Sequence, residues 1–130
     1  MCCSVKKRAD TVFQDFMVRS SQNWLLAKAI REALGRSQAY IGRKIFQHAS
    51  VVNTYENGGK ISKNAEKDLL DYISKQNYEQ YDNSSTDDFI LYTIRVMSSY
   101  ISHCHEWDLH EDDEMIKKLM GKQISMLCFE

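Results

Sequence analysis

The sequence predicts an all-α protein, and three observations support that prediction. Proline is absent from all 130 residues, so nothing breaks a helix from within. Apolar residues recur at three- and four-residue spacing in the long segments, without the strict alternation of a half-buried strand. Hydrophobic residues make up 43% of the chain and charged residues 27%, which is the composition of a globular protein with a core.

The first predicted helices are short and have recognisable ends. An amphipathic helix is expected near residues 10–18, and a second over residues 22–34 stops at Gly35, a residue typical of helix C-caps. Ser37 is well placed to cap the start of a third short helix. The spacing thus predicts three elements within the first 45 residues.

The middle of the chain predicts two more helices. One begins near Ala49 and stops at the turn signal of residues 57–59, Asn-Gly-Gly. The next begins after Ser62, a capping serine, and runs to about residue 76. The polar stretch 77–86 is then expected to be a linker.

The last part of the chain predicts one long helix and one short helix. The long helix spans residues 87–105, with Thr86 as its expected cap. Its apolar stripe either packs on the preceding helices or forms a surface for a dimer or another partner. An acidic loop at 106–114 and a short helix at 115–120 follow.

Charge divides the chain into two halves of opposite sign. Residues 1–76 carry 13 Lys and Arg against 7 Asp and Glu, whereas residues 77–130 carry 4 against 11. This split suggests a basic surface for phosphates and an acidic surface for a protein partner. The alternative is that both are solvated faces without a partner.

Membrane, secretion and disulfide signals are all missing. No apolar run approaches the roughly 18 residues that a membrane span requires, and the first residues lack the apolar core of a secretory signal. The four cysteines do not have the spacing of a disulfide framework, which favours free thiols (Cys2, Cys3, Cys104 and Cys128). The expected location is therefore intracellular, in the reducing cytoplasm or nucleus, with no membrane partner.

Two short predicted helices meet at a tight turn at residues 46–48. Such a pair, braced by flanking helices, is typical of a helix-turn-helix, in which the second helix lies in a groove of DNA. The chain would then consist of an N-terminal arm (1–21), a helix-turn-helix domain (22–76), the linker (77–86) and an acidic helical extension (87–130).

Two sequence runs resemble the phage-repressor (Cro/C1-type) helix-turn-helix family. The run SQAYIGRKI at residues 37–45 resembles the family's SQ-x-x-[LI]-[AG]-x-x-[IL] start, and VVNTYENG at 51–58 resembles its end. Within that superfamily, the pattern V-I-N-x-Y-E-x-G-x-x-I-x-x-N is closest to multiprotein bridging factor, a transcriptional coactivator. The resemblance covers about residues 24–76 and implies a four- to five-helix repressor-like bundle, here with a helical C-terminal extension.

The resemblance also implies roles for individual residues. Arg31 and Glu56 occupy the places of an ion pair that joins the first helix to the recognition helix. Gln38 occupies the place of a phosphate-binding glutamine. Further contacts to duplex DNA are implied for one set of residues on and around the recognition helix (Arg43, Lys44, Ala49, Ser50, Asn53, Thr54 and Lys60).

The chain also departs from the bridging-factor pattern. The family's two prolines are replaced by Ala49 and Ser62, and the chain carries an acidic extension of about fifty residues. Ala49, Ser50 and Thr54 are poor readers of base edges compared with Arg, Asn or Gln, so contacts mainly to phosphates are as consistent with the sequence as base recognition.

The functional prediction is a transcription regulator or coactivator that touches DNA through its basic face and a protein, such as the transcription machinery, through residues 87–130. Two alternatives stay open: a protein-interaction scaffold within a large assembly, and a toxin-neutralising protein. A homodimer is also open, since palindromic DNA sites would call for one. An enzyme is not expected, because no Gly-rich phosphate loop, nucleophile elbow or H-E-x-x-H motif occurs.

A metal site and a cofactor are likewise not expected. His103, Cys104 and His105 are adjacent on a helix and therefore point in different directions. Together with His110 they lack the paired spacing of a structural zinc site.

Overall fold

The computed structural model describes residues 4–127, which are all-α with no strand in that range. The predicted fold class is thereby confirmed. Seven helices occur in the described part of the chain: α1 (Val5–Arg19), α2 (Asn23–Ala33), α3 (Gln38–Lys44), α4 (Ala49–Glu56), α5 (Lys63–Asn83), α6 (Thr86–Glu106) and α7 (Asp113–Met126).

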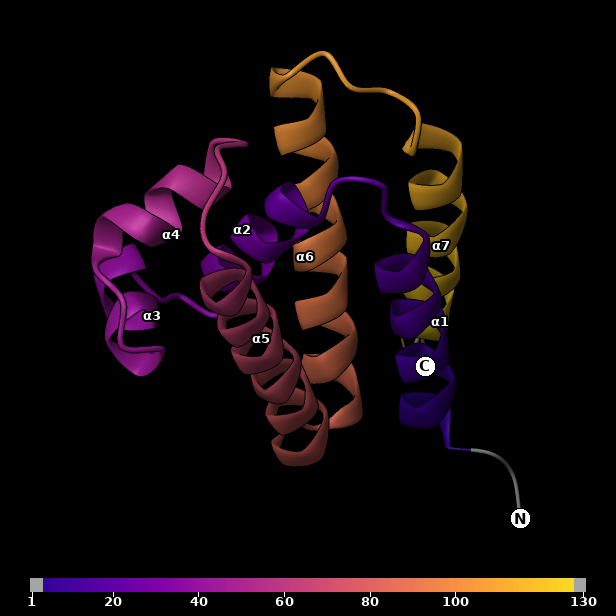
Figure 1. Ribbon diagram of the computed structural model, residues 1–130. Coiled ribbons are helices and arrows are strands. Elements are labelled where there is room, and N and C mark those ends of the chain that lie inside the picture. Colours follow the sequence, from indigo (N-terminus) through magenta and orange to yellow (C-terminus); the bar gives the residue numbers. More distant parts are fainter. Residues whose placement is uncertain (1–3, 128–130) are drawn as a thin grey trace.

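Helix α6 is the centre of the molecule. It packs against α2, α1 and α7, while α5 packs on α2 (Figure 1). The helices α1 and α7 lie side by side at one edge, and α3 and α4 lie at the opposite edge (Figure 1). The N-terminal helix and the C-terminal helices therefore form one body with α2.

The core between α1 and α6 is aromatic. Phe13 meets the edge of Phe89 with ring centroids 6.2 Å apart, and Phe16 meets Tyr100 at 5.5 Å. All four side chains are fully buried. The segment predicted as an N-terminal arm (1–21) is therefore mostly a core helix, because the apolar face of α1 is covered by α6 and α7.

A buried carboxylate joins three segments of the chain. Oδ2 of Asp112 accepts hydrogen bonds from the Tyr100 hydroxyl at 2.6 Å and from both the backbone N–H and the hydroxyl of Ser21 at 2.9 Å. The Tyr100 hydroxyl in turn accepts the backbone N–H of Gln22 at 3.0 Å. These bonds fix the connection between α1 and α2 against the start of α7.

The expected linker at 77–86 is wrong, because α5 continues to Asn83 and only Ser84 and Ser85 separate it from α6. Contacts with α6 hold this polar segment in helical form. Asn77 is buried and accepts a hydrogen bond from the Tyr92 hydroxyl, and Tyr81 packs on the edge of Phe89 at 5.2 Å.

The apolar stripe of α6 faces inward. Of the two alternatives, packing on the other helices is therefore the correct one for most of its residues, and they do not form a free surface for a partner. Its cap is Ser85 and not Thr86, since the Ser85 hydroxyl accepts the N–H of Asp88. The predicted short last helix is longer than expected, spanning Asp113–Met126.

The structure bears on the predicted free cysteines and on the prediction that no segment spans a membrane. Cys104 is a free, buried cysteine, whereas Cys2, Cys3 and Cys128 lie outside the described residues. None of the described helices combines the length and the hydropathy needed to cross a membrane.

Candidate nucleic-acid interface

Helices α3 and α4 form a compact pair joined by the four residues 45–48. Each helix begins with a side-chain cap. The Ser37 hydroxyl accepts the N–H of Tyr40 at 3.0 Å, as predicted, and the His48 Nδ1 atom accepts the N–H of Ser50 at 3.1 Å. The imidazole cap had no signal in the sequence, since histidine is not among the favoured N-cap residues.

Gly42 allows the backbone of the connection between α3 and α4 to lie close to α3. The N–H of Gln47 donates to the Gly42 carbonyl at 2.8 Å. A Cβ atom at position 42 would lie 2.8 Å from the Gln47 carbonyl oxygen and 3.3 Å from the nitrogen of Ala49. These neighbours are backbone atoms that cannot rotate away, so a residue without a side chain is needed here.

Phe46 occupies a conformation that usually belongs to glycine. Its φ angle is +58°, in the left-handed region, which costs an L-residue with a side chain roughly 1–2 kcal/mol. Its side chain is 95% exposed. The turn therefore carries an aromatic ring into solvent at the edge of the α3–α4 pair.

The predicted ion pair between Arg31 and Glu56 is present. Arg31 donates from Nε to Oε2 at 2.6 Å and from Nη2 to Oε1 at 2.9 Å, and Glu56 is only 2% exposed. Gln38, predicted as a phosphate contact, donates its Nε2 hydrogens to Oε1 of Glu56 at 2.9 Å and to Oδ1 of Asn53 at 3.3 Å. This amide group is thus part of the network around Glu56.

The outer face of α4 carries the predicted base-facing residues. Ser50, Asn53 and Thr54 are exposed, whereas Ala49 is half-buried. Oδ1 of Asn53 also accepts from Asn57 Nδ2 at 3.2 Å, so this carbonyl is already engaged on two sides.

Lys60 lies beside α4 although it belongs to the next connection. It shares with Ser50 and Thr54 a surface hollow of about 320 Å³. The structure therefore brings three of the predicted residues together, from α4 and from the connection between α4 and α5.

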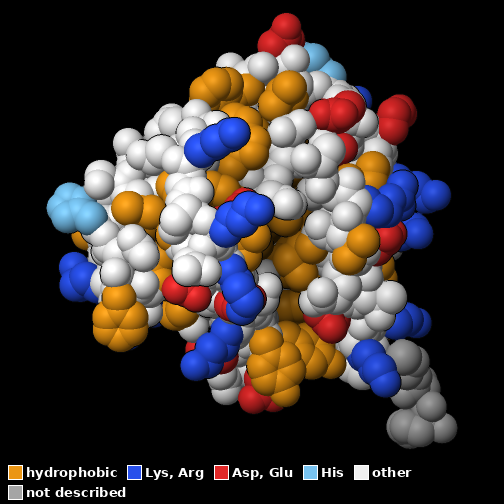
Figure 2. All heavy atoms as spheres, in the orientation of Figure 1, with side chains coloured by type: hydrophobic (Ala, Val, Ile, Leu, Met, Phe, Trp, Pro, Cys, Tyr) orange, Lys and Arg blue, Asp and Glu red, His pale blue; other side chains and the backbone are white. Residues whose placement is uncertain are grey.

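Every exposed charge from residue 35 to residue 64 is positive. This segment contains five cationic residues and a single carboxylate, Glu56, which is buried against Arg31. All five cationic side chains are exposed (Arg36, Arg43, Lys44, Lys60 and Lys63). A line of Lys and Arg side chains runs over the connection from α4 and along α5 (Figure 2).

Lys63 had not been predicted as part of the site. The signal that could have identified it is its position directly after the capping Ser62, three residues from Lys60; Lys67 follows one helical turn later in α5. Lys67 is partly neutralised by Asp71, 2.7 Å away, so the positive charge is strongest near the start of α5.

Comparison of the chain with models of known protein families, with curated proteins and with solved structures gave no significant match. The likeness to the bridging-factor family therefore rests on the residues quoted above.

Proposed function

We propose that the protein binds duplex DNA through the α3–α4 pair and regulates transcription, as a regulator or coactivator of the bridging-factor type. The observation that carries the proposal is the wholly positive exposed charge of residues 35–64. Positive charge over two short helices attracts a polyanion such as DNA. When Lys and Arg side chains neutralise its phosphates, the counterions condensed on the DNA are released.

The side chains on α4 favour backbone contacts over base reading. Ser50 and Thr54 present short hydroxyl groups, which bond phosphate oxygens readily but discriminate weakly between bases. Asn53 keeps its NH₂ group as a donor, because its carbonyl oxygen is the atom engaged by Gln38 and Asn57. We expect modest sequence preference and a strong dependence on salt.

The proposed protein-binding surface lies at the connection between α6 and α7. Since most of the apolar stripe of α6 is internal, a protein partner would meet the exposed acidic side chains around the α6–α7 connection (Glu106, Asp108, Glu111 and Glu114). Acidic side chains gather at this end in Figure 2. This surface lies beside the end of α4: a Cβ at Gly58 would lie 3.6 Å from the Trp24 ring, and the Trp24 and Trp107 ring centroids are 5.0 Å apart. A protein bound there would therefore be a neighbour of DNA bound at the α3–α4 pair.

The decisive experiment is fluorescence anisotropy with a labelled random duplex of about 20 base pairs over a salt series. The variant Arg43→Glu/Lys44→Glu is compared with wild type and with Lys117→Glu/Lys118→Glu, which makes the same charge change on α7. We expect wild type and the α7 variant to bind with a steep salt slope. The α3 variant should lose most of its affinity, and the slope should fall by about one unit for each phosphate contact removed.

A protein-interaction scaffold is the second candidate function, and the exposed Phe46 ring favours it. Aromatic residues are enriched where proteins contact one another, and this ring is held out at the turn of the pair. If neither wild type nor the α7 variant binds DNA at low salt, DNA binding is refuted and the scaffold function takes its place.

A further inference from the structure

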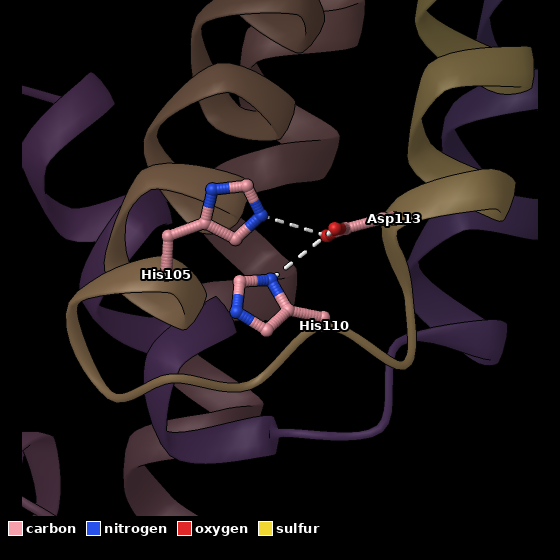
Figure 3. A group of neighbouring side chains, drawn as sticks. All are labelled: His105, His110 and Asp113. Carbon is pink, nitrogen blue, oxygen red and sulfur yellow. Dashed lines mark hydrogen bonds and ion pairs between the residues drawn. The ribbon is translucent and has the colours of Figure 1, made fainter.

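Three side chains that are separated in the sequence converge at the α6–α7 connection (Figure 3). His105 lies in the last turn of α6, His110 in the connection and Asp113 at the first position of α7. The His105 Nε2 atom is 2.9 Å from Oδ1 of Asp113, and the His110 Nδ1 atom is 3.4 Å from Oδ2. One donor atom from each residue lies within 4.8 Å of the other two.

The histidines considered from the sequence do not form this group together. His103 turns to Glu32, 2.7 Å away, and Cys104 is buried, so adjacent helix positions diverge as expected. Only His105 joins His110. The third member, Asp113, comes from an acidic run that has the appearance of an ordinary solvated charge cluster in the sequence.

We propose that His105, His110 and Asp113 bind a divalent transition-metal ion of the zinc class. Two imidazole nitrogens and one carboxylate oxygen are a donor set that suits Zn²⁺, Ni²⁺ or Cu²⁺, whereas Mg²⁺ and Ca²⁺ prefer oxygen donors alone. Three protein ligands leave a further coordination position, which water fills in zinc sites of this type.

The distances are close to those that such an ion requires. Bonds of about 2.0–2.2 Å in tetrahedral geometry place ligand atoms about 3.3–3.6 Å apart. The two contacts end on different oxygens of Asp113: His110 Nδ1 lies 3.4 Å from Oδ2 and His105 Nε2 lies 2.9 Å from Oδ1. One donor atom from each residue lies within 4.8 Å of the others, so side-chain rotations of about an ångström would bring three donors to the separation that an ion requires. The exposed fractions of the side chains, 44% for His105, 54% for His110 and 23% for Asp113, leave room for this movement.

A second observation concerns the ring nitrogen of His110 that faces away from the other two ligands. The other ring nitrogen of His110, Nε2, lies 2.9 Å from Oδ1 of Asp108. Metal-binding histidines usually donate their second N–H to a carboxylate, which fixes the ring and raises its basicity. The Asp108 side chain is 95% exposed, and its contact with His110 leaves the Nδ1 atom of that ring as the one directed at Asp113.

Metal binding would join the end of α6 to the start of α7. The site lies directly next to Asp112, the buried carboxylate that holds Tyr100 and Ser21. A bound ion would therefore stiffen the connection that positions this hydrogen-bond network, and we expect the thermal midpoint of unfolding to rise with metal concentration.

The test is isothermal titration of Zn²⁺ into the full chain, with thermal unfolding followed in parallel. All proteins carry Cys2→Ser, Cys3→Ser and Cys128→Ser, because free thiolates bind zinc on their own. We expect one ion per chain. His110→Ala should abolish binding, and Asp113→Asn should weaken it strongly.

Asp108→Asn tests the outer carboxylate, and asparagine tolerates the left-handed backbone at this position, where φ is +57°. We expect it to lower the affinity for Zn²⁺ by about 10- to 100-fold. His48→Gln removes a histidine on the α3–α4 pair. It should lower the thermal midpoint, because His48 caps α4, but it should leave the affinity for Zn²⁺ unchanged. The proposal is overturned if the parent takes up no Zn²⁺ at about 1 mM, or if His110→Ala binds as the parent does while its circular dichroism is unchanged.

Discussion

A single oxygen of Glu56, Oε1, accepts hydrogen bonds of 2.9 Å from both Arg31 and Gln38. The carboxylate belongs to α4, the guanidinium to α2 and the amide to α3. One buried charge therefore sets the position of the candidate DNA-binding helix relative to two others. The ion pair thus adds to the apolar contacts of Val52 and Tyr55, which are buried in the core.

Breaking that pair from one side should be more harmful than removing both partners. Arg31→Met leaves Glu56 buried without its cation, and we expect a loss of about 3–5 kcal/mol in the free energy of unfolding. The double variant Arg31→Met/Glu56→Leu should lose clearly less. Urea denaturation of both variants measures the difference; equal losses would contradict a desolvated charge at this position.

Gly42 and Gly121 should respond to alanine in opposite directions. At position 42 a Cβ meets the Gln47 carbonyl oxygen at 2.8 Å, so Gly42→Ala should cost about 1–3 kcal/mol and weaken DNA binding. At position 121, in the middle of α7, nothing lies within 4 Å, and alanine should stabilise by about 0.5–1 kcal/mol. Chemical denaturation of the two variants checks both signs.

Phe46→Asn should make the protein more stable. Asparagine accepts a φ of +58° more readily than phenylalanine does, and the ring loses no burial because it is 95% exposed. We expect a gain of about 1 kcal/mol by thermal unfolding. Gly35→Ala is the matched control: it places a side chain at φ +70° and should destabilise. A less stable Phe46→Asn variant would show that the ring is packed.

Glu32 should make stability depend on pH in the acidic range. Burial acts to raise its pKa, but hydrogen bonds from His103 and Ser99 outweigh it, so the pKa lies below the ordinary 4.5. The carboxylate therefore stabilises the fold above that value, and the effect disappears as pH falls through the lower folded pKa. Relative to Glu32→Gln, wild type should be more stable by at most about 1 kcal/mol at pH 5, since the side chain is 38% exposed.

That difference should be smaller at about pH 2.5 than at pH 5, because protonation of Glu32 at low pH makes its side chain neutral like that of glutamine. Urea denaturation at the two pH values measures it. Ser125→Ala, on the exposed side of α7, should show no such change with pH. A stability difference that grows on acidification would have the wrong sign for a lowered pKa.

The α3–α4 pair could be predicted from the sequence because single capping or turn residues indicate most of its helix ends. Ser37 and Ser62 cap the helix starts on either side of α4, and the turn at residues 57–59 contains Gly58 at φ +78°. The Arg31–Glu56 pair followed from the family pattern. These features depend on neighbours within a few turns, which periodicity and capping describe.

Helix capping and hydrophobic periodicity did not predict the tertiary contacts. The composition of residues 77–83 is that of a loop, but the segment is helical. Asn77 is bonded to Tyr92, 15 residues away, and Tyr81 packs on Phe89, 8 residues away. The convergence of His105 with Asp113 depends on how α6 and α7 are joined, which spacing alone does not determine. In the segment 77–83, tertiary packing outweighs the low intrinsic helix propensity of the polar residues.

The placement of α1 has a consequence for the order of synthesis. Residues 5–19 are translated before the helices that cover their apolar face, α6 and α7. Gln123 of α7, for example, donates to the carbonyl of Ala9 at 3.0 Å. During translation, Phe13 and Phe16 lack these covering helices until α6 and α7 have been made, and such transiently exposed apolar surface favours aggregation.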